Sequence, residues 1–480
     1  MFSSEQWLAN SGSSFYNGAT TTSFRNIPGA TLTLAQGTPT SATTFCMGGW
    51  FKRQNNAFYS NIFSAELGGS GVAAGIFAVS DDDTMFFYDK QSSDTFRLIT
   101  DREFRDTSAW YHVWMRVELG NGTAGERVQL WVNGVRETSF STETYPTASV
   151  CKGWNVSGKT LYMGHSNASY GGNIYYSDWY FIDGASVSPV DTVGEFKNGV
   201  FIPKAYSPTF GDNGFHLKFD QVGVGTPSTS TIGADTSGNT NHFTSTANTN
   251  VVVSDCGIPD SPELNFSTLN PLDKHATFPT LAEGNLKTVN AGSAWFYCRS
   301  TFSVTSGKWY VEIRQTGKYI FMGVMAQTLG LTTNSSSNST GVYACFNDNS
   351  NLKPYSTGTS GSDSGDFTDG DIVGLAYDYD AQTLKIYQNN TLRATVSSIP
   401  KTEAMSFMCG TAEITNTTVW NFGQDASFAG AITAGTETDG NGGVFKYAPP
   451  SGYKSLSSKN LEEPTIGANS DTIASDHFNT

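Results

Sequence analysis

Charged side chains are scarce in this sequence. Asp, Glu, Lys and Arg make up 15% of its 480 residues, whereas they make up about 25% of an ordinary soluble domain. The balance is acidic, with a formal net charge of −15 at pH 7, and no stripe of Lys and Arg interrupts it. Binding to nucleic acid or to an anionic membrane surface needs such cations. We therefore expect neither as a partner.

Long apolar runs are missing as well. No segment approaches the roughly 18 to 20 continuous apolar residues that span a bilayer. Residues 1–7 contain no basic region followed by an apolar one, which a secretory signal would require. We therefore expect a chain that is made and folded in a cytoplasm and that does not insert into a membrane.

Closely spaced cysteines are absent too. The six cysteines are far apart, and none forms a Cys-x-x-Cys pair: Cys46, Cys151, Cys256, Cys298, Cys345 and Cys409. In a reducing cytoplasm we expect free thiols, and we expect those in apolar runs to pack in the core. Zinc would need clustered ligands, and the sequence has no such cluster.

Gly, Ser, Thr, Asn and aromatic residues take the place of the missing charge. Aromatic residues make up 13% of the chain, with 32 Phe and 21 Tyr, and there are 50 Gly. Disordered chains combine few aromatics with a high charge density, so this composition indicates a folded chain. Turn formers beside β-formers predict many short strands.

Two runs show the clearest strand pattern. Residues 111–118 alternate, with Val113, Met115 and Val117 on one face. Residues 127–132 lead into Asn133-Gly134, which is a strong signal for a type I′ hairpin turn. Asn389-Asn390 has the same position after a later run.

Similar runs recur along the chain, with turn signals every ten residues or so. This spacing favours a β-sandwich or barrel, and no helical stripe of 12 or more residues is present. The other strand-like runs are residues 44–53, 74–79, 85–88, 214–220, 309–314, 319–325, 372–378, 383–387 and 418–422.

The length and the changes in composition predict two β-sandwich domains. One sandwich takes about 100 to 200 residues, which is too few for this chain. Pro, Ser, Thr, Gly and Asn dominate around residues 206–270, which indicates an irregular connector. The predicted parts are an arm at 1–19, a sandwich at 20–205, the connector at 206–270, a second sandwich at 271–460 and a tail at 461–480.

The first predicted sandwich carries an ordered series of motifs: Gly49-Trp50-Phe51-Lys52-Arg53, Ser108-Ala-Trp-Tyr-His-Val113, Leu130-Trp-Val-Asn-Gly134, Tyr162-Met-Gly164 and Trp179-Tyr-Phe-Ile-Asp-Gly184. In this order they resemble the laminin-G-like branch of the concanavalin A-like sandwich family. The resemblance implies an antiparallel jelly roll.

The second predicted sandwich carries another series: Ser306-Gly-Lys-Trp-Tyr-Val-Glu312, Gly370-Asp-Ile-Val-Gly374, Asp378-Tyr-Asp380, Thr383-Leu-Lys-Ile-Tyr387, Trp420-Asn-Phe-Gly-Gln424 and Pro449-Pro-Ser-Gly-Tyr453. This set resembles the SPRY domain, which is also a concanavalin A-like sandwich. Together the two resemblances imply an all-β protein with two antiparallel sandwiches.

The connector and the tail carry motifs of their own: Pro203-Lys-Ala-Tyr206, Asn213-Gly-Phe215, Gly233-Ala-Asp-Thr-Ser-Gly-Asn239, Leu269-Asn-Pro-Leu272 and Asn460-Leu-Glu-Glu-Pro-Thr-Ile466. With the two sandwiches, this succession resembles virion proteins of tailed phages, especially marine and cyanobacterial ones. These are usually called tail fibre or lectin-like structural proteins.

This resemblance implies a protein on the surface of the virion that recognises host surface glycans. It also implies a homo-oligomer, with a trimer favoured, attached to other virion proteins through the arm or the tail. A capsid decoration or fibre without glycan activity is the alternative, and a glycan depolymerase ranks third.

An enzyme is not expected. Concanavalin A-like glycosidases use carboxylates that alternate on one strand, because acid and nucleophile must flank one bond, and the Glu-x-Asp-x-Glu pattern is absent. The nearest approach is Asp101, Glu103 and Asp106. Asp101 and Glu103 would share a strand face, but Arg102 and Arg105 are close enough to pair with them.

Other candidate residues also have ordinary structural explanations. His112 lies among aromatics on a strand, so we expect a hydrogen-bonded structural histidine rather than a general base. Calcium favours oxygen ligands, and the acidic loops offer Asp81, Asp82 and Asp83, then Asp363, Asp366, Asp369 and Asp371. Neither loop has a fixed ligand spacing, so we favour solvated turns and expect no cofactor other than possible Ca²⁺.

Aromatic residues in Gly- and Asn-rich loops are the predicted glycan contacts. Sugar sites combine an exposed aromatic platform with a few polar groups. The candidates are Trp154, Asn155, Tyr170, Asn173, Tyr175 and Tyr176. The alternative is that a loop Trp caps the end of the sandwich or lies buried against a neighbouring subunit.

Overall fold

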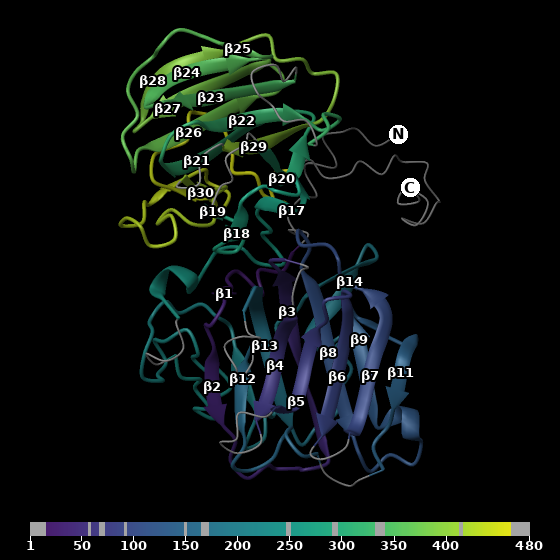
Figure 1. Cartoon of the computed structure of the whole chain (residues 1–480). Coiled ribbons are helices and arrows are strands. Elements are labelled where there is room, and N and C mark those ends of the chain that lie inside the picture. Colours follow the sequence, from purple (N-terminus) through teal and green to yellow (C-terminus); the bar gives the residue numbers. More distant parts are fainter. Residues whose placement is uncertain are drawn as a thin grey trace, which may run out of the picture.

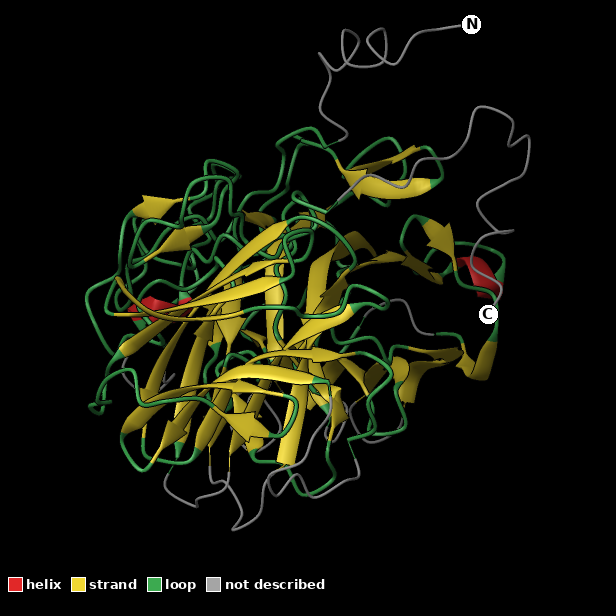
Figure 2. Ribbon diagram, turned by 90° about the horizontal axis from the view of Figure 1, so that it is seen from above, coloured by secondary structure: helices red, strands yellow, loops and turns green. Residues whose placement is uncertain are grey.

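The computed structural model describes residues 16–55, 59–66, 73–90, 94–147, 151–164, 172–245, 251–289, 296–331, 341–411 and 416–461. These residues form strands joined by loops, with short 3-10 turns at Ala124–Glu126 (η1) and Val253–Asp255 (η3). Figure 1 shows two sheet-built bodies, the second standing at one end of the first, and Figure 2 shows that strands and loops make up nearly all of the described chain. No helix in this part of the chain has the length and apolar character needed to cross a membrane.

Two seven-stranded antiparallel sheets face each other in the first sandwich. The first sheet has the order β1-β13-β3-β8-β9-β10, with β16 paired to β13. Its strands are β1 (Phe24–Asn26), β3 (Thr44–Arg53), β8 (Tyr111–Glu118), β9 (Val128–Val132), β10 (Val135–Arg136), β13 (Ile174–Asp183) and β16 (Phe215–Leu217).

The second sheet of this sandwich has the order β11-β7-β6-β5-β4-β12-β2. Its strands are β2 (Leu32–Ala35), β4 (Ser60–Glu66), β5 (Ala73–Val79), β6 (Thr84–Lys90), β7 (Asp94–Glu103), β11 (Phe140–Thr144) and β12 (Thr160–Met163). We call this the open sheet, because its outer face carries the groove described below.

The alternation read from the sequence places the core correctly. Val113, Met115 and Val117 point between the sheets and belong to one large apolar cluster. Their neighbours on the other face of β8, His112 and Trp114, pack in separate clusters on the outside of the sheet. The two-faced prediction for residues 111–118 is therefore confirmed.

The predicted hairpin turns are also present. Asn133 and Gly134 both have positive φ, 46° and 75°, as a type I′ turn requires, and they join β9 to β10. Asn389 and Asn390, with φ of 45° and 67°, join β27 (Thr383–Gln388) to β28 (Thr391–Val396).

The predicted connector is largely part of the first sandwich. β16 pairs with β13, and Phe215, Phe219 and Phe243 lie in the same core cluster as the strands. Most of residues 206–270 lie outside regular strands, as the irregular connector was predicted to, but their apolar residues complete this core. Their high content of turn formers produces loops that wrap the sheet rather than a linker.

Residues 194–203, just before this region, and Phe210 within it cover the outer face of the first sheet. A hairpin formed by β14 (Gly194–Lys197) and β15 (Val200–Pro203) packs Phe201 against Trp50 and His112. Phe210 stacks near Tyr180 on the neighbouring strand. The first sheet is thus buried on both faces, whereas the outward-facing side chains of β6 in the open sheet are only half-buried.

The start of the chain is held to this sandwich as well. Backbone N–H groups of Gly18 and Ala19 donate to the Glu263 carboxylate, at 2.8 and 3.0 Å, and the Asn17 amide donates to Glu195. Residues 17–19 of the predicted arm are therefore part of the folded body.

The second sandwich again consists of two seven-stranded antiparallel sheets. One has the order β17-β20-β29-β22-β23-β24-β25: β17 (Leu269–Lys274), β20 (Phe296–Val304), β22 (Ile320–Ala326), β23 (Val342–Asp348), β24 (Asn351–Ser356), β25 (Thr359–Ser360) and β29 (Met405–Thr411). The other has the order β18-β19-β30-β21-β26-β27-β28, with β18 (Thr280–Ala282), β19 (Lys287–Val289), β21 (Lys308–Thr316), β26 (Ile372–Asp378) and β30 (Thr417–Asn421) beside β27 and β28.

A C-terminal strap, residues 423–456, covers the outer face of this last sheet. It includes the small hairpin β31 (Glu437–Thr438) and β32 (Val444–Phe445). The buried Glu312 carboxylate on β21 accepts the backbone N–H groups of Lys446 and Tyr447, at 2.7 and 2.8 Å. Burial raises the pKa of Glu312 to about 7.

A buried ion cluster joins the two sandwiches. The guanidinium of Arg25, on β1, pairs with Asp255 at 2.9 Å and with Asp425 of the strap at 3.0 Å, and Glu283 lies 3.8 Å away. Arg25 and Asp255 are fully buried. Burial raises the pKa of Asp255 to about 6, although Arg25 opposes that shift.

Neutral hydrogen bonds cross the same seam. The Tyr175 hydroxyl donates to the backbone carbonyl of Gly284 at 3.1 Å, and the Asn285 amide donates to the carbonyl of Gln54. The turn before β19 therefore sits directly on the end of the first sandwich. Together, the sheet topology and this seam confirm the predicted all-β fold with two antiparallel sandwiches.

Candidate functional site

The outer face of the open sheet is the most distinctive surface of the described residues. Burial alternates strictly along β6: Met85, Phe87 and Asp89 point into the core. The residues between them, including Phe86 and Tyr88, point outward. Two large aromatic side chains therefore stand on a sheet face that the covering loops of the first sandwich do not reach.

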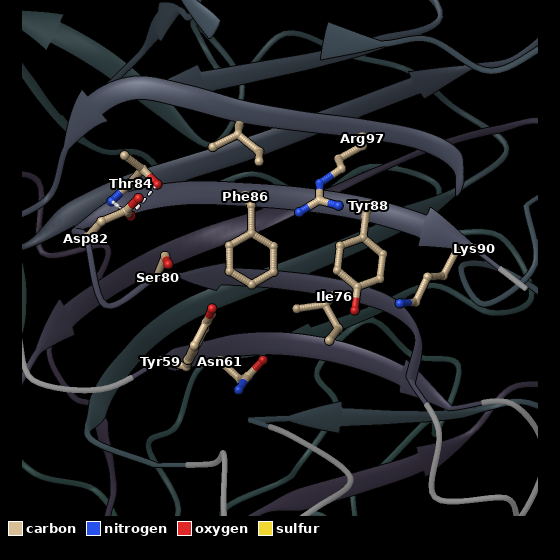
Figure 3. A pocket seen from close by; sticks show the side chains of 11 residues that line it. Tyr59, Asn61, Ile76, Ser80, Asp82, Thr84, Phe86, Tyr88, Lys90 and Arg97 are labelled. Atoms are coloured by element: carbon tan, nitrogen blue, oxygen red, sulfur yellow. Dashed lines mark hydrogen bonds between the residues drawn. The ribbon is translucent and has the colours of Figure 1, made fainter. Parts of the chain in front are cut away.

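A groove crosses this face over β4, β5, β6 and β7. Ile76 on β5 lines it and clusters with Phe86 and Tyr88. The groove has a volume of about 490 Å³, and its lining, shown in Figure 3, is Tyr59, Asn61, Ile76, Ser80, Asp82, Thr84, Phe86, Tyr88, Lys90, Arg97 and Ile99.

Three aromatic rings line the groove in a defined arrangement. Phe86 and Tyr88 are nearly parallel, with ring centroids 5.9 Å apart and an angle of 9° between the planes. Tyr59 meets Phe86 edge-on, at 6.0 Å and 80°. Tyr59 is 44% exposed, so this aromatic surface is accessible from solvent.

Polar groups occupy both ends of the aromatic strip. At one end the Asp82 carboxylate accepts the hydroxyl and the backbone N–H of Thr84, at 2.6 and 3.0 Å, and these hydrogen bonds lower the pKa of Asp82. At the other end the Lys90 ammonium lies 5.0 Å from the centre of the Tyr88 ring. Arg97 lies directly opposite Tyr88 in the β6–β7 register.

These groups suit binding better than hydrolysis. A glycosidase needs one carboxyl with a raised pKa beside a second carboxylate. Asp82 is the carboxylate among the lining residues, and its pKa is shifted downward. The groove therefore offers aromatic rings, the Asp82 carboxylate, the cations of Lys90 and Arg97 and the Asn61 amide. Its lining contains no carboxyl group with a raised pKa.

The carboxylates weighed as catalytic groups are held by neighbours. Asp101 and Glu103 lie at the end of β7. Glu103 pairs with Arg105 at 2.6 Å, as the sequence suggested, whereas Arg102 pairs with Glu137 rather than with Asp101. Asp101 instead accepts the Ser139 hydroxyl.

Asp106, the third of these carboxylates, forms part of the turn before β8. It accepts the hydroxyl and the backbone N–H of Ser108, at 2.6 and 2.7 Å.

The prediction that Trp154 and Asn155 form an exposed sugar platform is wrong. Trp154 is fully buried, stacks on Phe63 at 5.5 Å, and donates its ring N–H to the carbonyl of Tyr88. Asn155, also buried, donates to the Asp183 carboxylate. The Gly-rich loop folds inward because the large indole fills the core at the end of the sandwich.

Two further predicted glycan contacts, Tyr175 and Tyr176, are buried as well. Tyr175 is buried at the seam described above, and Tyr176 is buried with its hydroxyl donating to the carbonyl of Ile62. Asn173 is half-buried and bonds through its backbone to the neighbouring strand end. Tyr170 lies outside the described residues.

The acidic loops are organised by their own turns. Asp83 pairs with Arg53 at 2.6 Å and lies 3.4 Å from Arg105, and Asp81 accepts the Ser80 hydroxyl. In the second sandwich, three carboxylates accept backbone N–H groups nearby: Asp363 from Gly365, Asp369 from Gly317 and Asp371 from Thr368. The backbone carbonyl of Asp366 accepts the Gln388 amide. Among the described residues, no three His, Cys, Asp or Glu side chains gather as a metal site would require.

His112 is structural, but it is held by rings rather than by side-chain hydrogen bonds. It lies 5.1 Å from Trp50 and 5.0 Å from Phe201, centre to centre. Its Nδ1 atom has no hydrogen-bond partner in the described structure, so the expected hydrogen-bonded histidine is wrong in that detail. Burial lowers the pKa of His112 to about 3, which keeps the ring neutral.

All six cysteines are buried and unpaired, as expected. Burial raises the pKa of Cys46, Cys256 and Cys409 to about 12. Thiols with such a pKa are unreactive near neutral pH. The cysteines therefore act as small apolar residues in the cores.

Comparison with known proteins gives matches of fold only. No protein-family model matches the sequence, and no curated protein matches it. Similar solved structures include the PSpry domain of TRIM65 (TM-score 0.28, 12% identity, 32% of this chain and 88% of that one) and the SPRY domain of human HERC1 (TM-score 0.28, 12% identity, 33% and 97%). Stonustoxin is also similar (TM-score 0.26, 19% identity, 32% and 27%).

Proposed function

We propose that this chain is a carbohydrate-binding structural protein of a bacterial virus, and that the groove of the open sheet is its sugar site. The observation that carries the proposal is the pair of nearly parallel rings, Phe86 and Tyr88, which line a groove with polar groups at both ends.

The chemistry of sugars fits this arrangement. A pyranose ring presents an apolar face of C–H groups and an edge of hydroxyls, so its sites pair aromatic faces with a few polar groups. Phe86 and Tyr88 supply the apolar surface, while Asn61, Asp82 and Thr84 supply acceptors and donors on either side. The groove is open along the sheet, which suits a chain of sugars more than a small enclosed ligand.

The viral setting rests on resemblance. The motifs of residues 203–272 and 460–466, in their order with the two sandwiches, are similar to those of tailed-phage virion proteins. Under this proposal the chain lies on the virion surface and attaches to other virion proteins through its ends. A homo-oligomer, with a trimer favoured, remains part of the proposal.

A second candidate function is a structural decoration of the capsid without sugar binding. Exposed apolar side chains outside the groove favour it: Val222, Val252 and Val253 lie beside the seam, at 47–56% exposure. Such a patch suits a protein contact. Labelling intact particles with an antibody and imaging them by electron microscopy separates a tail location from a capsid location.

Glycan binding by two variants tests the sugar site. Replacing both Phe86 and Tyr88 with Ala should lower affinity for a bound oligosaccharide by at least about tenfold, which corresponds to 1.4 kcal/mol. Phe196→Ala is the control, because Phe196 is a solvent-exposed ring on the β14–β15 hairpin, outside the groove. Unchanged binding in the double variant, or equal losses in the control, would reject the site.

A further inference from the structure

The two cations of the groove flank a single aromatic ring. Lys90 is two residues after Tyr88 on the same face of β6, and its ammonium lies 5.0 Å from the centre of that ring. Arg97 is the register partner of Tyr88 on β7 and also lines the groove. Figure 3 shows both side chains beside Tyr88, with Asp82 and Thr84 at the opposite end.

Several other basic residues of the first sandwich form ion pairs outside the groove: Arg53–Asp83, Arg102–Glu137, Arg105–Glu103, Arg116–Glu118 and Arg136–Glu126. Within the described residues Lys90 forms no ion pair, and its recorded contact is the Tyr88 ring. The groove is thus a local cationic spot on a chain of net charge −15.

We infer that the groove selects acidic saccharides. The inference rests on the proposed sugar site and adds the class of its ligand. A sugar ring stacked on Phe86 and Tyr88 would direct a carboxylate or a sulfate ester toward Lys90 and Arg97. Asp82 at the opposite end repels that group, so the charges also fix the direction in which the ligand lies.

Single-stranded nucleic acid is the competing ligand, because stacked rings beside cations also bind bases. A nucleic-acid strand carries one phosphate per base and needs a cationic groove along its whole length. Here the cations lie at one end only, and Asp82 occupies the other. The arrangement therefore favours a glycan with an acidic sugar over a polynucleotide.

An oligosaccharide array with uronate-bearing, sulfated and neutral members, together with a dT oligonucleotide, tests the inference on the full chain. We expect acidic members to be retained at least about tenfold more strongly than neutral ones of equal length. The uronate and sulfate members show which acidic group is preferred. Equal retention of neutral and acidic members would overturn the inference but leave the sugar site intact. Retention of the oligonucleotide alone would overturn both, as would retention of no member at all.

Charge-removing variants assign the preference to the groove. Lys90→Gln and Arg97→Gln should each weaken binding to acidic members by about fivefold, the upper range for a partly exposed ion pair. Each should weaken binding to neutral members by less, so the ratio of acidic to neutral binding falls. Lys401→Gln removes the same charge from an exposed site on the second sandwich and should change neither. An acidic preference that survives both groove variants would overturn the inference.

Discussion

At the scale of single residues, burial separates the aromatics that build the cores from those that face solvent. Trp154 looked like a surface platform because its neighbours are Gly and Asn, yet its indole is completely buried. Phe86 lies within the strand-like run Met85-Phe-Phe-Tyr88, and it lines the groove. The composition of the neighbouring residues does not show whether an aromatic side chain points into the core or toward solvent. The alternation of buried and exposed positions along the strand does show it.

Trp154→Ala should therefore destabilise the fold. Removing a fully buried Trp leaves a large cavity, at a cost of about 3–5 kcal/mol in the free energy of unfolding. Chemical denaturation measures this cost directly. A variant that keeps its stability but loses glycan binding would contradict this account, because it would show that Trp154 contacts the glycan at the surface.

At the scale of elements, the sequence predicts the strands well, but it does not predict which segments pack over the faces of the sheets. The runs at residues 44–53, 111–118 and 372–378 coincide with β3, β8 and β26, because period-two alternation is a local signal. The covering role of residues 206–270 is not local. Its Phe and Leu residues are spaced by turns, so only the position of the sheet beneath shows that they fill a core.

The groove was missed for a related reason. Thr84, Phe86, Tyr88 and Lys90 do alternate with buried residues, and that signal places them on one face. Which sheet face remains accessible depends on where the β14–β15 hairpin and the connector pack. These are contacts between residues far apart in the sequence, so the hydrophobic periodicity does not predict them.

The C-terminal strap provides a pH-dependent prediction. The pKa of Glu312 is about 7 in the folded chain, above its value of 4.5 without burial, so the folded state binds the proton more tightly. Protonated Glu312 therefore contributes to the free energy of unfolding. This contribution is fully present below about pH 4.5 and is lost as the pH rises through 7. The contribution is on the order of 3 kcal/mol.

Denaturation between pH 4.5 and 8 checks this dependence against a Glu312→Gln variant. The unaltered chain should lose more stability than the variant over that interval, because Gln does not ionise. Parallel pH profiles for the two proteins would show that Glu312 does not titrate there and that the strap is anchored differently.

At the scale of the whole molecule, the two sandwiches are joined at their ends and leave the open sheet uncovered (Figure 1). The seam contains the Arg25 cluster, in which one cation faces three carboxylates. A buried pair of this kind fixes geometry, and removing one member leaves uncompensated charge. The seam therefore holds the groove in a constant orientation relative to the second sandwich.

Arg25→Met should lower the free energy of unfolding by about 3–5 kcal/mol, because it leaves buried carboxylates without a cation. Arg136→Met is the control, since it removes a partly exposed pair with Glu126 and should cost at most about 1 kcal/mol. Calorimetry provides the readout. We expect one transition for the unaltered chain and two for Arg25→Met; two transitions in the unaltered chain would contradict a stabilising seam.

The ends of the chain provide a prediction about assembly. Deleting residues 1–15 removes the segment before the contacts of residues 17–19 and should abolish incorporation into particles if that segment is the anchor. Deletion of 1–19 would also remove the hydrogen bonds to Glu195 and Glu263, so the shorter deletion is the cleaner test. Normal incorporation of the shorter variant would assign attachment to another part of the chain.

A crystal structure of the full chain with an oligosaccharide retained on the array tests the central claim most directly. The account predicts a sugar ring stacked on Phe86 and Tyr88 in the groove of the open sheet, with its acidic group toward Lys90 and Arg97. A saccharide bound at the seam, on the second sandwich, or at the loop around Trp154 would contradict it.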